Sequence, residues 1–154
     1  MATPSEKLAQ SLEALRALQA RGLVAIRSGD LTRTHRERVL KGGYLQEVMK
    51  GWYIPSRPDE PAGESTAWYA SYWEFCAAYL NERFAQDWSL SPEQSLLLHA
   101  GNRTVPRQLL VRAKKARNNI TAFPHGTSLL DVRAALPEAR DVAELDNLRL
   151  FSLP

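Results

Sequence analysis

The sequence has a single cysteine, three histidines and no apolar run close to the roughly 20 residues that span a bilayer. One cysteine, Cys76, excludes an internal disulfide and a cysteine-rich zinc site. The amphipathic N-terminus does not resemble a signal peptide. We therefore expect a cytoplasmic protein without a membrane segment. With 154 residues and 44% apolar content, the chain can form one domain or two small ones.

Patterns that indicate catalysis are also missing. His99 and His125 have no nucleophile or carboxylate at a matching spacing, and there is no glycine-rich phosphate loop. A metal-dependent nuclease needs paired acids and a lysine, and Asp131 followed by Arg133 is the nearest approach. A stand-alone nuclease is thus disfavoured, and we expect no enzymatic activity, cofactor or metal. Cys76 lies among aromatic residues and is expected to be a core thiol.

Charge is distributed unevenly along the chain, although the net charge is only +3. Residues 1–60 have ten Lys or Arg against seven Asp or Glu, whereas residues 61–100 have one against five. Residues 101–117 have six Lys or Arg and no acid. Two basic segments separated by an acidic one favour a polyanionic partner, because polyanions respond to local patches of charge.

Residues 32–55 contain the most informative pattern. They predict a short basic helix that starts with a Thr34/Glu37 capping box, a stop at Gly42-Gly43, and a hairpin turning at Lys50-Gly51. The strands of the hairpin are predicted at 45–49 and 52–54. A basic helix followed at once by a two-stranded ribbon is typical of a winged helix-turn-helix, because the major groove of B-DNA admits one helix.

The rest of the N-terminal part supports this arrangement. Leucines at 8, 12, 15 and 18 predict a helix over 5–19 that stops at Gly22. A short strand is expected at 23–26 and one helical turn at 28–31. We therefore predict a winged-helix DNA-binding domain over 1–56, followed by a Pro- and Gly-rich linker over 57–65.

The second half, 66–154, is predicted to be a small α+β domain, so the whole chain belongs to the α+β class. A helix is expected over 66–84, whose aromatic residues at 68, 72, 75 and 79 form one stripe and should pack in the core. A second helix should begin at Ser91-Pro92, with Gln94 completing a capping box, and end at Gly101. Strands are predicted at 108–111, 119–123, 128–132 and 148–153. The apolar ending at 150–154 suggests a longer protein truncated at its C-terminus.

The motif Arg38-x-Leu40-Lys41-x-Gly43-x-Leu45, followed by Val48-x-Lys50-Gly51-x-Tyr53, resembles the winged helix of the AbiEi family, the antitoxins of type IV toxin–antitoxin systems. Residues 90–101 resemble the segment that follows the wing in those proteins, and the resemblance covers roughly residues 8–135. It implies binding to promoter DNA, repression of the protein's own operon, and neutralisation of a nucleotidyltransferase toxin without a stable complex.

The run Lys50-Gly51-Trp52-Tyr53-Ile54-Pro55 is also similar to the N-terminal segment of longer proteins of the Fic (filamentation) family. The Fic catalytic motif, His-Pro-Phe-x-x-Gly-Asn-Gly, is absent from the chain. The alternative function is therefore a protein-interaction or regulatory module for a Fic-type catalytic domain outside this sequence.

The candidate DNA contacts lie on and around the basic helix. Its outward face is predicted to hold His35, Arg38 and Lys41, with Arg36, Val39 and Leu40 turned inward. Arg38 is the candidate base reader because a guanidinium pairs with two acceptors on guanine, whereas Lys41 suits phosphate. The remaining candidates near helix starts are phosphate contacts: Arg27, Ser28, Arg33 and Thr34. Lys50 at the wing tip is a candidate for contact with a phosphate or with the minor groove. A solvated charged face is the alternative for all of them.

The second basic segment forms a further candidate patch. It comprises Arg103, Arg107, Arg112, Lys114, Lys115 and Arg117. One interpretation is a second nucleic-acid surface, and the other is a hairpin tip kept soluble by its charge. The aromatic helix over 66–84 is not expected to stack bases, because its neighbours are acidic and would repel phosphate.

Overall fold

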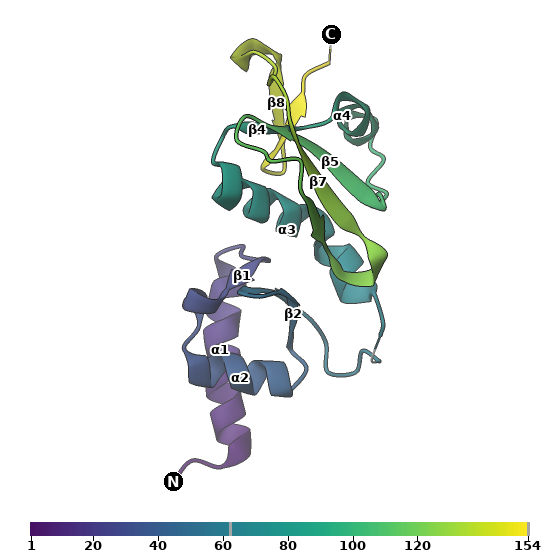
Figure 1. Cartoon of the computed structure of the whole chain (residues 1–154). Coiled ribbons are helices and arrows are strands. Elements are labelled where there is room, and N and C mark those ends of the chain that lie inside the picture. The colour runs from purple at the N-terminus through teal and green to yellow at the C-terminus, as the bar shows by residue number, and fades with distance from the viewer. Residues whose placement is uncertain (62, 154) are drawn as a thin grey trace. The chain divides into compact units, whose positions relative to one another are not determined.

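The computed structural model describes residues 1–61 and 63–153 and shows an α+β protein. The chain divides into two compact units, residues 1–71 and 72–154, and the division falls inside the long helix α3 (Thr66–Phe84) (Figure 1). No helix within the described residues is long and apolar enough to cross a membrane.

The first unit combines two helices, one helical turn and a small antiparallel sheet. Its elements in chain order are α1 (Pro4–Ala20), β1 (Ile26–Arg27), η1 (Ser28–Asp30), α2 (Arg33–Lys41), β2 (Leu45–Met49) and β3 (Trp52–Pro55). The strand order is β1-β3-β2, so the short β1 adds a third strand to the β2–β3 hairpin. These elements confirm the predicted helix, helical turn, basic helix and hairpin. The short strand predicted at 23–26 forms instead at Ile26–Arg27, so only Ile26 is common to both.

An apolar core holds these elements together. Leu15 and Leu18 of α1 pack with Val39 of α2, and Ile26 and Tyr53 pack with them from the sheet. Val39 and Ile26 are fully buried. Burying such side chains contributes roughly 1.5–3 kcal/mol each, so the leucine stripe of α1 and one face of α2 fix the positions of the helices.

The start of α2 differs from the expected capping box. The N-cap is Thr32, whose hydroxyl accepts a hydrogen bond from the His35 amide at 3.2 Å. Helix α2 therefore begins at Arg33, and Thr34 lies exposed inside the first turn. The Thr34/Glu37 capping box is wrong, because Thr32 satisfies the first free amides two residues earlier.

The second unit places helices against a four-stranded mixed sheet. After α3, its elements are β4 (Trp88–Leu90), α4 (Pro92–His99), β5 (Gln108–Ala113), β6 (Ile120–Ala122), η2 (Pro124–Gly126), β7 (Ser128–Arg133), η3 (Ala139–Asp141), β8 (Val142–Leu145) and β9 (Leu148–Phe151). The strand order is β4-β5-β7-β6, in which β5 and β7 run parallel and the other pairs antiparallel. Strands β8 and β9 form a separate hairpin.

The aromatic stripe of α3 is packed in the core, as predicted. Trp68, Tyr72 and Phe75 are fully buried, and the rings of Phe75 and Tyr79 both meet Phe123 edge-on. The four predicted strands are present, with small differences at their ends. Ser91 caps α4 by accepting a hydrogen bond from the Gln94 amide. The Ser91 amide itself donates to the Leu110 carbonyl at 3.2 Å and not to the Gln94 side chain, so the reciprocal half of the predicted capping box is wrong.

Candidate nucleic-acid interface

The turn of the β2–β3 hairpin brings three of the predicted DNA contacts together. The Arg27 guanidinium stacks 4.0 Å from the centroid of the Trp52 ring. The Ser28 amide donates a hydrogen bond to the Gly51 carbonyl at 3.2 Å, which places η1 beside the hairpin turn. Gly51 has a φ of +86°, the left-handed conformation that this turn needs, and Lys50 is exposed next to it. Arg27, Ser28 and Lys50 therefore belong to one cationic corner.

The exposed face of α2 is different from the predicted one. Arg33, Thr34, Glu37 and Lys41 are all exposed and follow helical spacing, so they form one stripe, hereafter the α2 stripe. The Arg33 Nε atom lies 2.9 Å from Glu37 Oε1. The hydrogen bond that Arg33 donates to Glu37 and the negative charge of Glu37 raise the pKa of Arg33, so this guanidinium stays charged. Within the stripe, Glu37 offsets the charge of Arg33.

His35 and Arg38 turn toward α1 rather than to solvent. His35 Nδ1 hydrogen-bonds to Ser11 Oγ at 2.8 Å, and Ser11 is fully buried. Arg38 Nη1 lies 3.4 Å from both Ser11 Oγ and the Lys7 carbonyl. The expectation that His35, Arg38 and Lys41 share one outward face is therefore wrong for His35 and Arg38, because the polar side chain of Ser11 on α1 gives them hydrogen-bonding partners.

Arg38 and Lys41 still border a shallow hollow between the two helices. Lys7 and Leu8 of α1 line its other side, and its volume is about 360 Å³. Arg36 lies inward as predicted, and its guanidinium donates a hydrogen bond to the Ser28 carbonyl at 2.7 Å. This bond links α2 to η1, so the two elements hold their relative positions.

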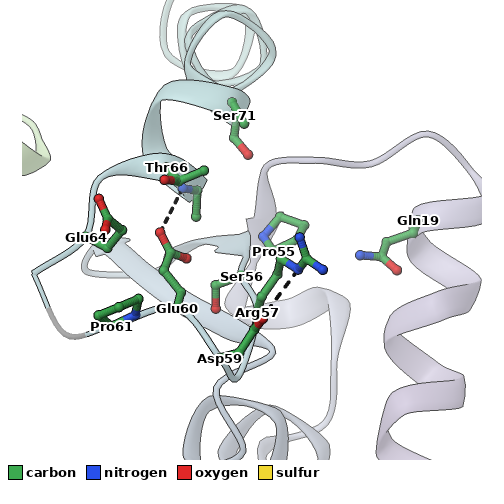
Figure 2. Close-up of a pocket in the computed structure, with 12 residues that line it drawn as sticks. Gln19, Pro55, Ser56, Arg57, Asp59, Glu60, Pro61, Glu64, Thr66 and Ser71 are labelled. Atoms are coloured by element: carbon green, nitrogen blue, oxygen red, sulfur yellow. Dashed lines mark hydrogen bonds and ion pairs between the residues drawn. The ribbon is translucent and has the colours of Figure 1, made fainter.

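A larger hollow, drawn in Figure 2, lies where the chain leaves β3 and enters α3. Its volume is about 650 Å³, and its charged lining consists of Arg57, Asp59, Glu60 and Glu64. Glu60 turns its carboxylate to the start of α3, where it accepts a hydrogen bond from the Ala67 amide at 3.1 Å. Arg57 lies 3.8 Å from Asp59. An acidic lining repels phosphate, so this hollow is not a candidate for nucleic acid.

The second basic patch is partly neutralised in the structure. Arg103 pairs with Asp146 at 3.0 Å, and the Arg112 guanidinium lies 5.4 Å from the Phe151 ring centroid. The other four members have exposed side chains: Arg107, Lys114, Lys115 and Arg117. Asp146 lies outside the 101–117 segment, and for this reason the charge count along the sequence did not include it.

Two of the residues considered for catalysis have partners within the fold. His99 Nε2 hydrogen-bonds to the Phe151 carbonyl at 2.7 Å, and His125 is exposed in η2. Asp131 is buried with Arg83 2.8 Å from its Oδ2 atom. Among residues 1–61 and 63–153, no group of three or more His, Cys, Asp or Glu side chains is placed to bind a metal ion.

Sequence reasoning missed three features of the candidate interface. These are the Arg27–Trp52 stacking, the Arg33–Glu37 pair and the role of Ser11. The Arg33–Glu37 spacing of four residues is a signal for an ion pair on a helix and was available from the sequence. The other two contacts join residues more than 20 positions apart, which periodicity within one element does not reveal.

Comparison with known proteins gives no family for this chain. No family model matches the sequence, and neither a curated protein nor a solved structure shows significant similarity to it. The functional argument therefore rests on the geometry and charges described above.

Proposed function

We propose that the first unit is a winged helix-turn-helix that binds double-stranded DNA, and that the protein represses its own operon as an antitoxin-like regulator. In this proposal α2 enters the major groove and the β2–β3 hairpin is the wing. One observation carries it: the exposed α2 stripe is followed at once by a hairpin with Lys50 at its turn. Both elements are fixed by the same core.

In this proposal, different side chains of the first unit contact different parts of the DNA. Thr34 and Lys41 are exposed on α2 and can reach base edges or phosphates in the groove. The first amides of α2 and the guanidinium of Arg33 suit a phosphate. Lys50 and Arg27 at the hairpin suit the neighbouring backbone. Arg38 remains partly accessible beside Lys41 and becomes a phosphate contact at the edge of the groove, in place of its expected role as base reader.

Glu37 is the feature that opposes DNA binding on this face. Its carboxylate lies within the α2 stripe and is paired with Arg33. Binding requires that Arg33 exchange this carboxylate for a phosphate, which is feasible because both side chains are more than half exposed and such surface pairs contribute only about 0–1 kcal/mol. The same feature favours the second candidate function, a protein-docking module for a Fic-type catalytic domain.

The wider role follows from the resemblance noted in the sequence. A repressor of this type acts in the cytoplasm on the promoter of its own operon, and its functional partner is a toxin encoded there. The protein carries out no reaction itself in this proposal.

The test is binding of the full chain to the promoter DNA upstream of its own gene, measured by fluorescence anisotropy at two salt concentrations. A scrambled duplex of equal length is the control for specificity. We expect salt-sensitive, promoter-specific binding that is weakened in Thr34→Ala and Lys41→Ala. Gln10→Ala, an exposed position on α1, is the control variant. Equal weak binding to both duplexes, unchanged by the α2 variants, would reject the repressor and favour the protein-docking module.

A further inference from the structure

The outer face of the sheet in the second unit carries an exposed aliphatic row. Leu110 of β5 is in register with Leu130 of β7, and Leu130 is in register with Ile120 of β6. Side chains at paired positions lie on the same face of a sheet, about 5 Å apart. Leu110 is 41% exposed and Ile120 is 66% exposed, with Leu130 half-buried between them. We call these three residues the aliphatic row.

The opposite face of the same strands is buried under α3. Leu109, Val111 and Leu129 are fully buried there, and Arg83 of α3 reaches Asp131 on that face. The strands thus alternate between core and surface, yet one surface position of each strand (Leu110, Leu130 and Ile120) holds an aliphatic side chain where a polar one is usual. Large exposed aliphatic side chains gathered in one place are typical of an interaction surface.

The chain segment that carries the aliphatic row is rich in cations. Residues 101–135 have seven Lys or Arg and one acid, Asp131, which is buried and paired with Arg83. Arg112 lies two positions beyond Leu110 on the same face of β5. The segment between β5 and β6 adds exposed Lys114, Lys115 and Arg117 close to Ile120 in the chain. The aliphatic row is therefore accompanied by several cations, and residues 101–135 contain no exposed acidic side chain.

From these observations we infer that the outer face of the β5-β7-β6 sheet binds a protein segment that carries both acidic and aliphatic side chains. The aliphatic side chains of the partner cover the aliphatic row, and its carboxylates meet Arg112, Lys114, Lys115 and Arg117. Charge complementarity of this kind sets specificity and accelerates association. Single-stranded nucleic acid fits less well, because bases stack on aromatic rings and the row contains none.

The test uses the full chain and a fluorescently labelled synthetic helical peptide with leucines on one face and glutamates on the other. A second peptide has lysine in place of every glutamate, and a third has serine in place of every leucine. Labelled oligouridine is the nucleic-acid probe. Anisotropy titrations at two salt concentrations compare the four probes. We expect binding of the leucine–glutamate peptide alone, weakened by salt.

Two pairs of variants locate the binding site. Ile120→Ser removes the most exposed member of the row, and Leu96→Ser is its matched control because Leu96 of α4 is 61% exposed. Lys114→Glu combined with Lys115→Glu reverses the border charge, and Arg21→Glu in the first unit is the charge control. We expect Ile120→Ser to weaken peptide binding about tenfold, as removal of one buried aliphatic contact implies. The double reversal should weaken binding by a similar factor, because it replaces attraction to the glutamates of the peptide with repulsion. The controls should change it less than about twofold.

Each alternative result overturns the inference. Oligouridine binding that falls with the charge reversal but not with Ile120→Ser would assign the patch to RNA. Failure of the leucine–glutamate peptide to bind, or equal loss in Ile120→Ser and Leu96→Ser, would show that the row is no docking site. Promoter DNA binding by the same variants reports on the first unit separately, so failure of this inference does not affect the repressor proposal.

Discussion

His35 Nδ1 lies 2.8 Å from the hydroxyl of Ser11, a fully buried residue on α1. Together with the buried Val39, this contact holds one side of α2 against α1. His35 therefore lies on the inward side of α2, and Arg38 Nη1 lies 3.4 Å from the same hydroxyl. As a consequence, the α2 stripe of Arg33, Thr34, Glu37 and Lys41 becomes the surface that a ligand meets first.

Replacing Ser11 should destabilise the first unit. Ser11→Ala removes the partner of His35 Nδ1, and leaving a part-buried polar atom without a hydrogen bond costs roughly 1–3 kcal/mol. We expect the free energy of unfolding to fall by about 1 kcal/mol, because alanine recovers part of the loss through its helix propensity. Ser5→Ala, at an exposed position of the same helix, supplies that propensity gain alone. Urea denaturation measures both. Equal stability of the two variants would show that the contact contributes nothing.

Removing the charge of Glu37 should strengthen DNA binding. Glu37→Gln releases Arg33 and takes a negative charge out of the α2 stripe. We expect a Kd for promoter DNA roughly two- to tenfold lower at about 0.1 M salt, where charges within about 10 Å still interact. Anisotropy titration measures the change.

The matched control for Glu37 is Glu13→Gln. Glu13 is exposed on α1 and pairs with Arg16 at 3.8 Å, so the change in net charge is the same. If Glu13→Gln tightened binding as much as Glu37→Gln, net charge alone would explain the effect. DNA would then not lie on α2.

The hairpin turn should contribute one phosphate contact. For Lys50→Ala we expect the plot of log affinity against log salt to become shallower by about 0.9, since each neutralised phosphate contributes roughly that amount. Binding to promoter and scrambled DNA should weaken alike, because phosphate contacts carry no sequence information. Arg140→Ala, at an exposed position in the second unit, changes the net charge equally and should leave the slope unchanged. An unaltered slope in Lys50→Ala would remove the hairpin from the interface.

Asp131 should be a structural anchor of the second unit. Its Oδ1 accepts hydrogen bonds from the Arg117 and Asn119 amides at 3.0 and 3.2 Å, and its Oδ2 lies 2.8 Å from Arg83. Asp131→Asn removes the charge that balances Arg83, and breaking a buried pair in this way costs about 3–5 kcal/mol. Because Arg83 is 29% exposed, solvent reduces the cost of leaving it unpaired. We therefore expect the free energy of unfolding, measured by urea denaturation, to fall by about 2–4 kcal/mol.

An exposed ion pair in the same unit provides the comparison for Asp131. Asp146 is 58% exposed and lies 3.0 Å from Arg103. Asp146→Asn should lower the free energy of unfolding by less than about 1 kcal/mol, because exposed ion pairs usually contribute no more than that. Similar losses in the two variants would mean that burial does not strengthen the Asp131 pair.

The sequence predicted most elements because their signals are local. The leucine stripe of α1, the aromatic stripe of α3 and Gly51 in the hairpin each act within a few residues. Strands β4 and β8, which are three and four residues long, were not predicted. The turn between β8 and β9 did carry a signal in the sequence, because Asp and Asn are residue types that favour such turns. In the structure Asp146 and Asn147 both have positive φ, as a two-residue hairpin turn of this kind requires.

The candidate site was harder to predict than the fold. The outward face of α2 depends on what α1 offers to His35 and Arg38, and Ser11 is 24 positions away from His35. The partial neutralisation of the second basic patch likewise depends on Asp146, which is distant in sequence from Arg103. Charge counts along the chain do not include such long-range pairs.

Cys76 should make stability depend on alkaline pH. The thiol is fully buried, and loss of hydration raises its pKa above the ordinary value. In the unfolded chain the thiol ionises near pH 8.5, whereas in the folded protein it stays protonated. The folded state thus binds more protons above that pH, so this contribution to stability is complete below about pH 8.5 and declines as pH rises further, by up to about 1.4 kcal/mol per pH unit.

The comparison of the protein with Cys76→Ala isolates this effect. The variant is less stable at neutral pH because it leaves a small cavity, but it lacks the thiol that ionises on unfolding. Between pH 8 and 10, denaturant midpoints of the wild type should fall more steeply than those of the variant. A thiol reagent should react with Cys76 only in the unfolded protein, because the thiolate is the reactive form. In the folded protein the thiol stays protonated, and its burial keeps the reagent away. Parallel pH profiles, or rapid labelling of the native protein, would show that the Cys76 thiol is accessible and ionises in the fold.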